Sequence, residues 1–188
     1  MILSGINVTI IRSSRKTLSL QLRHGEIIAR APLRMKDEDI YKFIESKHSL
    51  IKKHLTDIAE RQKAVDEAEP FTEKEIEALY EKAKQIIPER VKHYAPLIGV
   101  TYNRITIRCQ RTRWGSCSSK GNLNFNCLLA MFPCEIIDSV VVHELCHRKH
   151  MNHSEQFYAE INKVFPKYKE CNKWLKDNGG IHMERLAK

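Results

Sequence analysis

The stretch Val141–Phe157, VVHELCHRKHMNHSEQF, places four of the chain's nine histidines within eleven residues. His143 and His147 flank Glu144 in a His-Glu-x-x-His pattern. On a helix, side chains four residues apart project from the same face, so both imidazoles can reach one zinc ion at about 2.0–2.1 Å. Glu144 would overhang the open coordination position, where it could take a proton from water. The pattern therefore predicts a catalytic metal centre.

The residues before this pattern predict that it lies on a buried helix. Pro133 precedes the apolar segment EIIDSVVVHELCH, which would bury most of its circumference. A histidine and a glutamate are costly in such a place without partners, and a metal ion would supply the partner. The alternatives are a structural zinc site or no metal. A structural site is usually closed by cysteines, which would leave Glu144 without a role.

The third metal ligand has to come from beyond the helix. We expect it to be His153, where the chain can turn back, in preference to Glu155 or Glu160. On a continued helix His150 would stand roughly 10 Å along the axis from the first histidine, so we expect it at the surface. Asn152 and Ser154 are candidate caps of the next helix, and Asn152, with a glutamate three residues later, resembles a capping box. Three histidines would leave the fourth position open, as in catalytic zinc sites.

Composition indicates a soluble globular protein. Of the 188 residues, 42% are hydrophobic and 29% are charged, and no apolar run approaches the roughly 18–20 residues of a membrane span. The start of the chain lacks the order of a signal peptide, so we expect a cytoplasmic protein. The six cysteines include no Cys-x-x-Cys pair, and we expect free thiols. The net charge of +9 suits an anionic partner, although it is spread along the chain.

Hydrophobic patterns divide the chain into three regions, which we expect to pack as one compact unit. Residues 1–98 should hold three short antiparallel strands ending near Pro32, a helix from about residue 37 to 65, and a second long helix after Pro70 that Pro88 should kink or restart. Residues 99–178 should form the catalytic core, in which VTYNRITIRCQRTRWGSC and NLNFNCLLA are strands joined by a turn. Residues 179–188 should be a tail after a C-cap at Gly179.

Two segments, TRWGSCSSKGNLNFN (112–126) and VVVHELCHRKHMNHSEQF (140–157), make the chain resemble the YgjP-like metal-dependent hydrolases, relatives of the SprT-like and WLM zinc metallopeptidase domains. The resemblance implies an α+β fold. Its zincin-like metallopeptidase core would pack an edge-bearing antiparallel sheet on the His-Glu-x-x-His helix, with an N-terminal β-hairpin or meander and two long helices. It also implies His143, His147 and His153 as ligands of one Zn²⁺ or another divalent ion, and Glu144 as the catalytic base. The chain departs from the family pattern at Cys127 and His150.

In zincin-like folds an edge strand binds substrate by strand addition above the metal helix. Either NLNFN or RWGSC would be that strand here. Arg113, Trp114 and Ser116 are candidates for lining the cleft or orienting a ligand histidine, and core packing is an equal alternative for Trp114. Arg111, two residues from Arg113, would face the same side of a strand and could contact an anion. Asn126 is a further candidate for binding substrate.

Three functions follow, of which a metallopeptidase acting on a peptide or protein is preferred. The first alternative is a nucleoside-triphosphate pyrophosphatase of the UTP type on the same metal site, as described for some family members. The +9 charge and the arginines fit this reaction, whereas the lack of a Gly-rich phosphate loop counts against it. The second is a DNA-associated SprT-like protease, but no interleaved aromatic platform supports nucleic-acid binding. We expect no membrane partner.

Overall fold

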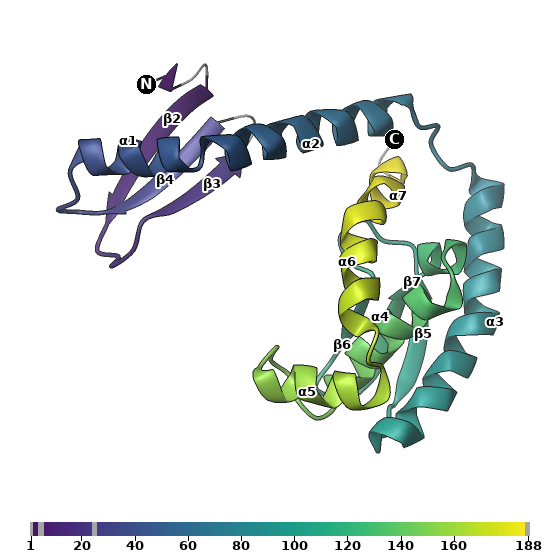
Figure 1. Ribbon diagram of the computed structural model, residues 1–188. Helices are drawn as coiled ribbons and strands as arrows, with labels where there is room; N and C mark the ends of the chain where they lie inside the picture. The colour runs from purple at the N-terminus through teal and green to yellow at the C-terminus, as the bar shows by residue number, and fades with distance from the viewer. Residues whose placement is uncertain (1, 4–5, 24–25, 187–188) are drawn as a thin grey trace. The chain divides into compact units, whose positions relative to one another are not determined.

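The computed structural model describes residues 2–3, 6–23 and 26–186. The chain is a mixed α+β protein that divides into two compact units, Met1–Ala64 and Val65–Lys188 (Figure 1). This division differs from the single compact unit that the sequence predicts and from the boundary expected after residue 98. The reason is that the helix before that boundary packs against the helices and strands that follow it, and so belongs to the C-terminal unit.

The N-terminal unit contains a four-stranded sheet, with strand order β1-β2-β4-β3. Its strands are β1 (Ile2–Leu3), β2 (Ile6–Ser13), β3 (Ser19–Arg23) and β4 (Glu26–Pro32). The β3 and β4 strands form an antiparallel hairpin, but β4 pairs in parallel with β2, so the expected antiparallel meander is wrong here. Alternating hydrophobicity fixes the face to which each side chain points and leaves the choice of neighbouring strand open. Here β4 lies between β2 and β3.

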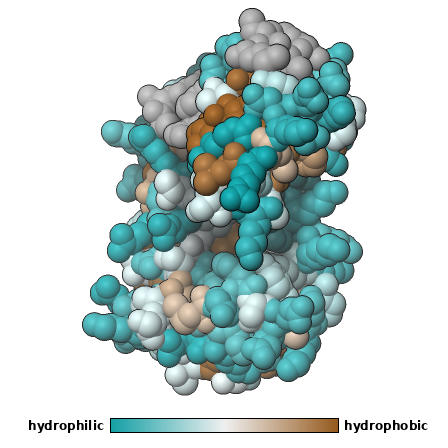
Figure 2. Space-filling model, turned by 90° about the vertical axis from the view of Figure 1, so that its left-hand side faces the viewer, coloured by the Kyte–Doolittle hydropathy of each residue, from teal (hydrophilic) through white to brown (hydrophobic). Residues whose placement is uncertain are grey.

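Two helices follow this sheet, α1 (Asp37–Ser46) and α2 (His48–Glu67), where the sequence predicted one. Ile40 and Ile44 of α1 are buried with the apolar side chains of β2 and β4. Leu50 and Ile58 of α2 remain more than half exposed, and they border an apolar hollow of about 470 Å³ beside β3 and α1. In the space-filling view, hydrophobic side chains form a patch among hydrophilic ones (Figure 2).

The C-terminal unit begins with the long helix α3 (Glu73–Ile98). Thr72 starts it with a capping box to Glu75, and Gly99 ends it in the left-handed conformation at φ 75°. The helix continues through Pro88 and does not restart there. Loss of one backbone hydrogen bond at a proline is offset by the buried face of α3, which packs against the rest of the unit.

A three-stranded sheet in the order β5-β7-β6 lies in this unit. Its strands are β5 (Arg104–Arg108), β6 (Gly115–Cys117) and β7 (Asn122–Asn126). The β6 and β7 strands are antiparallel, as expected, whereas β5 and β7 are parallel. Leu123 and Phe125 point into the core, so that the alternate residues of β7 present a polar face. Both β5 and β6 are edge strands of this sheet.

The predicted apolar helix is α4 (Cys134–Cys146), which follows the 3₁₀ helix η1 (Cys127–Met131). It contacts α3, α5 (Glu155–Val164), α6 (Tyr168–Asn178) and β6. A short helix, α7 (Gly180–Arg185), replaces the expected tail. The tail prediction was wrong because Gly179 has right-handed helical angles (φ −72°, ψ −33°), so the chain resumes a helix. Met183 of α7 is buried.

A partly buried ion pair joins α3 to α4. The Arg90 guanidinium donates from Nε and Nη2 to the two carboxylate oxygens of Asp138, at 2.5 and 2.7 Å, and Tyr94 Oη donates to Oδ2 at 3.1 Å. Asp138 is 5% exposed, and these three bonds satisfy its carboxylate. The pair therefore fixes α4 against the long helix.

Two expectations about the whole chain can be compared with the described residues. All six cysteines carry free thiols, as predicted. Every helix within residues 2–3, 6–23 and 26–186 is either too short or too polar to cross a membrane.

Candidate active site

Three histidines converge at the C-terminal end of α4. His143 lies in its last turn, His147 is its C-cap, and His153 directly precedes Ser154, the N-cap of α5. Nε2 of His143 lies 3.1 Å from Nε2 of His147 and 3.1 Å from Nε2 of His153. Nitrogens bound tetrahedrally to one zinc at about 2.0–2.1 Å would be separated by roughly 3.3 Å. The three imidazoles therefore fit a single divalent ion.

Hydrogen bonds behind two of these rings fix their orientation. Nδ1 of His143 lies 2.7 Å from Oη of Tyr168 in α6, and Nδ1 of His147 lies 3.0 Å from the backbone oxygen of His150. The Nδ1 atoms are thus engaged on the outer side, and both Nε2 atoms face the shared centre. Such contacts set the tautomer and raise the basicity of a ligand histidine.

A tight turn and one aromatic ring bring His153 to the other two. The N–H of His150 donates to the oxygen of Cys146, which ends α4 and reverses the chain. Phe157 in α5 is fully buried, and its ring centroid lies 4.6 to 5.0 Å from those of all three histidines. Of the two candidate caps, Ser154 is the one that caps α5, where its hydroxyl accepts from the N–H of Phe157. Because Ser154 is the cap, His153 stands just outside the helix.

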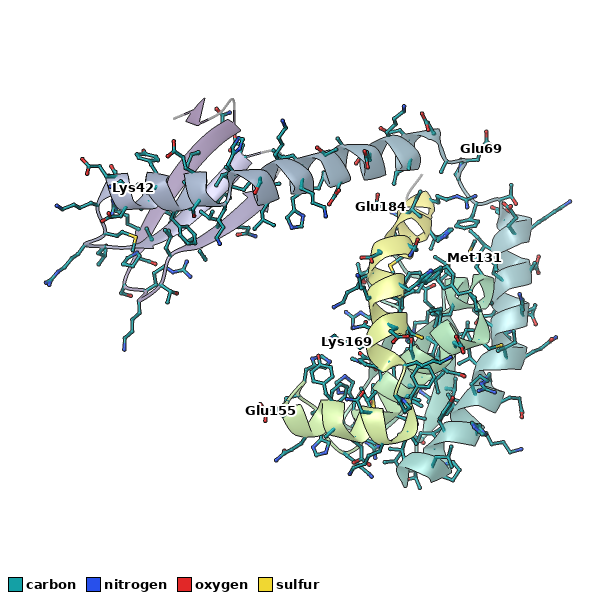
Figure 3. The ribbon with its side chains drawn as sticks, in the orientation of Figure 1. Lys42, Glu69, Met131, Glu155, Lys169 and Glu184 are labelled. Atoms are coloured by element: carbon teal, nitrogen blue, oxygen red, sulfur yellow. The ribbon has the colours of Figure 1, made fainter. Side chains whose placement is uncertain are left out.

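Carboxylates weighed as third ligands lie elsewhere. Glu155 is exposed in the first turn of α5, where its labelled side chain can be found in Figure 3. Glu160 pairs with Lys149 and Lys163. Among the described residues, the group with metal-ligand geometry consists of the three histidines.

Burial favours the neutral form of His143 and His147. Burial, with His147 and His153 nearby, lowers the pKa of His143 to about 3, and burial also lowers the pKa of His147. A neutral imidazole is the form that binds a metal ion. The electrostatics of the cluster therefore agree with its geometry.

Glu144 is 5% exposed and lies against the backbone of β6. A Cβ atom on Gly115 would stand 2.6 Å from Oε1 of Glu144, so only glycine permits this approach. Burial raises the pKa of Glu144 to about 8, and the positive charge of Arg113 opposes this shift. A hollow of about 480 Å³ lies in front of Glu144 and the three histidines, and its other lining residues include Thr112, Arg113 and Ser116.

The predicted substrate-binding residues separate into two groups. Arg113 and Ser116 line the hollow in front of the histidines. Trp114 packs on Phe132, with ring centroids 5.3 Å apart, and also lines a smaller cavity of about 200 Å³ beside His143 and Glu144. Trp114 therefore both packs in the core and forms part of a cavity wall.

The other two candidates are not placed as expected. Residues 109–114 form a loop where a strand was predicted, so Arg111 and Arg113 do not share a strand face. Arg111 is exposed and lines neither of these hollows. Asn126 is fully buried: its Nδ2 donates to the backbone oxygens of Gln110 and Arg113, and its Oδ1 accepts from Leu128. This position does not suit substrate binding, because the amide is used to hold the 109–114 loop.

Sequence reasoning missed Tyr168, Gly115 and Phe157. Tyr168 lies twenty-five residues after His143 on another helix, and nothing in its local sequence indicates the contact. Gly115 stands within the quoted motif, but its approach to Glu144 depends on how β6 packs on α4. Phe157 could be recognised only as an apolar residue of the α5 face.

Comparison with known proteins gives a family match over most of the chain. A family model described as YgjP-like, metallopeptidase domain, matches residues 16–78 and 60–178. No curated protein matches the chain. Among solved structures, the metallopeptidase zymogen abylysin of Pyrococcus abyssi is 23% identical, with a TM-score of 0.45 over 50% of this chain and 95% of that one. The zymogen jannalysin of Methanocaldococcus jannaschii is 22% identical, with a TM-score of 0.44 over 48% and 93%.

Proposed function

The chain belongs to the YgjP-like family of metallopeptidase domains, and we propose that it is a zinc-dependent peptidase on a zincin-like core. In this proposal His143, His147 and His153 hold the metal and Glu144 is the general base. The observation that carries it is the convergence of three Nε2 atoms within 4.8 Å of one another, next to a buried carboxylate.

Peptide hydrolysis places the hydroxyl of water on the carbonyl carbon and a proton on the leaving nitrogen. A zinc ion held by the three histidines would polarise the carbonyl and make water more acidic. Glu144 accepts the proton that water loses and delivers it to the leaving nitrogen. The raised pKa of this carboxyl, about 8, suits a group that must both take and release a proton near neutral pH. The positive charge of Arg113 opposes that shift.

An extended substrate can pair with β6. Of the two strands expected to serve this purpose, NLNFN is β7 in the middle of the sheet, whereas the GSC residues of RWGSC form the edge strand β6. Ser116 lies on β6 and lines the hollow in front of the histidines. Backbone hydrogen bonds to β6 would then hold the scissile bond next to Glu144.

The test is Glu144→Gln in purified, metal-analysed protein, with Glu155→Gln as the matched control. Glu155 is an exposed glutamate at the start of α5, next but one to His153. We expect Glu144→Gln to keep one zinc per chain and to lose roughly 10²- to 10⁴-fold in turnover of an unfolded protein substrate. Glu155→Gln should keep both the bound zinc and the turnover of the natural protein. Full activity of Glu144→Gln would refute its role as base.

The same assay tests the pyrophosphatase alternative, which is favoured by Arg113 in the lining of the hollow in front of the histidines. A nucleoside-triphosphate panel is offered in parallel with the protein substrate. Pyrophosphate release that requires Glu144, without peptide fragments, would replace the peptidase proposal by that alternative.

A further inference from the structure

A second hollow adjoins the one in front of the histidines. It measures about 330 Å³ and is lined by Arg108, Gln110, Thr112, Arg113, Ser116 and Asn124. Thr112, Arg113 and Ser116 line both hollows, so the two lie side by side and share this wall. We call the second one the arginine hollow. Its position next to the candidate active site makes it accessible to a substrate residue near the scissile bond.

The polar face of the sheet forms the floor of the arginine hollow. In the sheet register, Asn124 of β7 pairs with Ser116 of β6, and Arg108 is the last residue of β5. Arg113 comes from the 109–114 loop, which the buried Asn126 fixes through the backbone oxygens of Gln110 and Arg113. The two arginines are therefore brought together by a strand end and an anchored loop.

The lining of the arginine hollow is rich in hydrogen-bond donors. Arginine side chains offer only donors. The Ser116 oxygen already accepts from Asn124 Nδ2 at 3.1 Å, which leaves its hydroxyl hydrogen free to be donated. Nε2 of Gln110 is buried without a hydrogen-bond partner. No Asp or Glu lines the hollow, and within the part of the chain that the structure describes neither arginine forms an ion pair.

A group that accepts hydrogen bonds, offers none and carries negative charge matches this lining. In a peptide, that group is a carboxylate, which arginine binds through paired, charge-assisted hydrogen bonds. We propose that the arginine hollow is a specificity subsite for a substrate carboxylate close to the scissile bond. This inference rests on the proposed peptidase function and names the preferred substrate as an acidic peptide. The carboxylate comes from an Asp or Glu side chain or from the end of the peptide chain.

The experiment compares paired peptides that differ by Glu or Gln at one position on either side of the cleavage point. One set is amidated at its C-terminus and a second set ends in a free carboxylate, so the two sources of the group are separated. We expect the zinc-loaded protein to cleave one acidic peptide roughly 10- to 100-fold better in kcat/KM than its neutral partner. A preference for the acidic peptide in the amidated set shows that the subsite binds a side-chain carboxylate. A preference found only in the set with a free C-terminus shows that it binds the carboxylate at the end of the chain.

Substitutions of Arg108 test whether the preference for acidic peptides comes from the arginine hollow. Arg108→Gln should bring the ratio of acidic to neutral peptide towards one, and Arg108→Glu should favour Lys at the same position. Arg104→Gln is the matched control: Arg104 is an exposed arginine on the same face of β5, four residues away and outside the hollow, so the ratio should stay as in the natural protein. Equal cleavage of acidic and neutral peptides by the natural protein, or an unchanged ratio in Arg108→Gln, would overturn the proposal.

Measurements of peptide binding test this inference independently of the proposed peptidase function. Fluorescence anisotropy of the labelled peptides on the Glu144→Gln protein needs no turnover. Tighter binding of the acidic peptide that Arg108→Gln abolishes supports the subsite even if no peptide is cleaved. A nucleoside triphosphate that displaces the probe far better than any acidic peptide would overturn the assignment to a carboxylate and favour a phosphate ligand.

Discussion

Replacing Tyr168 by phenylalanine tests how much the support behind a ligand histidine contributes to metal binding. The Tyr168 hydroxyl lies 2.7 Å from Nδ1 of His143 and the residue is 6% exposed. With Nε2 turned to a metal, Nδ1 carries the hydrogen and donates it to the tyrosine oxygen. In Tyr168→Phe that buried N–H loses its acceptor, and the ring loses the contact that fixes its tautomer. We expect a 10- to 100-fold loss of zinc affinity, or about 1.4–2.7 kcal/mol.

Competition with a colorimetric zinc chelator at fixed pH measures this change directly. Phenylalanine fills nearly the same volume, so the unfolding temperature should stay close to that of the natural protein. Tyr158→Phe is the matched control, because its ring lies 6.3 Å from that of His153 and its hydroxyl is not bonded to any of the three histidines. The control should bind zinc within about twofold of the natural protein. Equal zinc affinity of Tyr168→Phe and the natural protein would refute the reasoning.

Three further predictions concern other contacts. Arg90→Met leaves the buried Asp138 carboxylate with one remaining bond and should lower the free energy of unfolding by about 2–3 kcal/mol in urea titrations; a loss below about 1 kcal/mol would contradict a structural ion pair. His150→Ala should keep zinc stoichiometry and turnover, because only its backbone oxygen supports the metal ligand, and metal loss would show that its imidazole takes part. Hydrogen bonds from Lys149 and a second lysine lower the pKa of Glu160 below 4.5. That stability is present above pH 4.5 and lost as pH falls through the lowered pKa, so Glu160→Gln should flatten the acid side of the stability profile; parallel profiles for the two proteins would contradict it.

Local spacing was sufficient to locate most of the candidate metal centre. His143, Glu144 and His147 needed only helical periodicity, and the apolar residues before them predicted α4 correctly. To propose His153 as the third ligand, we needed only to assume one turn in the six residues after His147. The sequence limits the cap of the next helix to Asn152 or Ser154, because both residue types are good caps, and only the folded chain shows that Ser154 accepts the bond.

Strand pairing was predicted less well than strand existence. The alternation in β2, β3 and β4 was recognised, but the parallel pairing of β2 with β4 and of β5 with β7 was not. The composition of the 109–114 segment predicts a strand. In the fold it is a loop held by Asn126, whose amide was assigned to substrate binding.

The sequence by itself determined the features that depend on a few neighbouring residues: the helix with its histidines and glutamate, the free cysteines and the family. Only the tertiary structure decided which residues from distant segments surround that helix. Tyr168 behind His143, Gly115 against Glu144, and Arg108 beside Arg113 each come from elements far apart in the chain. The physical reason is that helical spacing is set by backbone geometry within a turn, whereas these contacts depend on how whole helices and strands pack around one core.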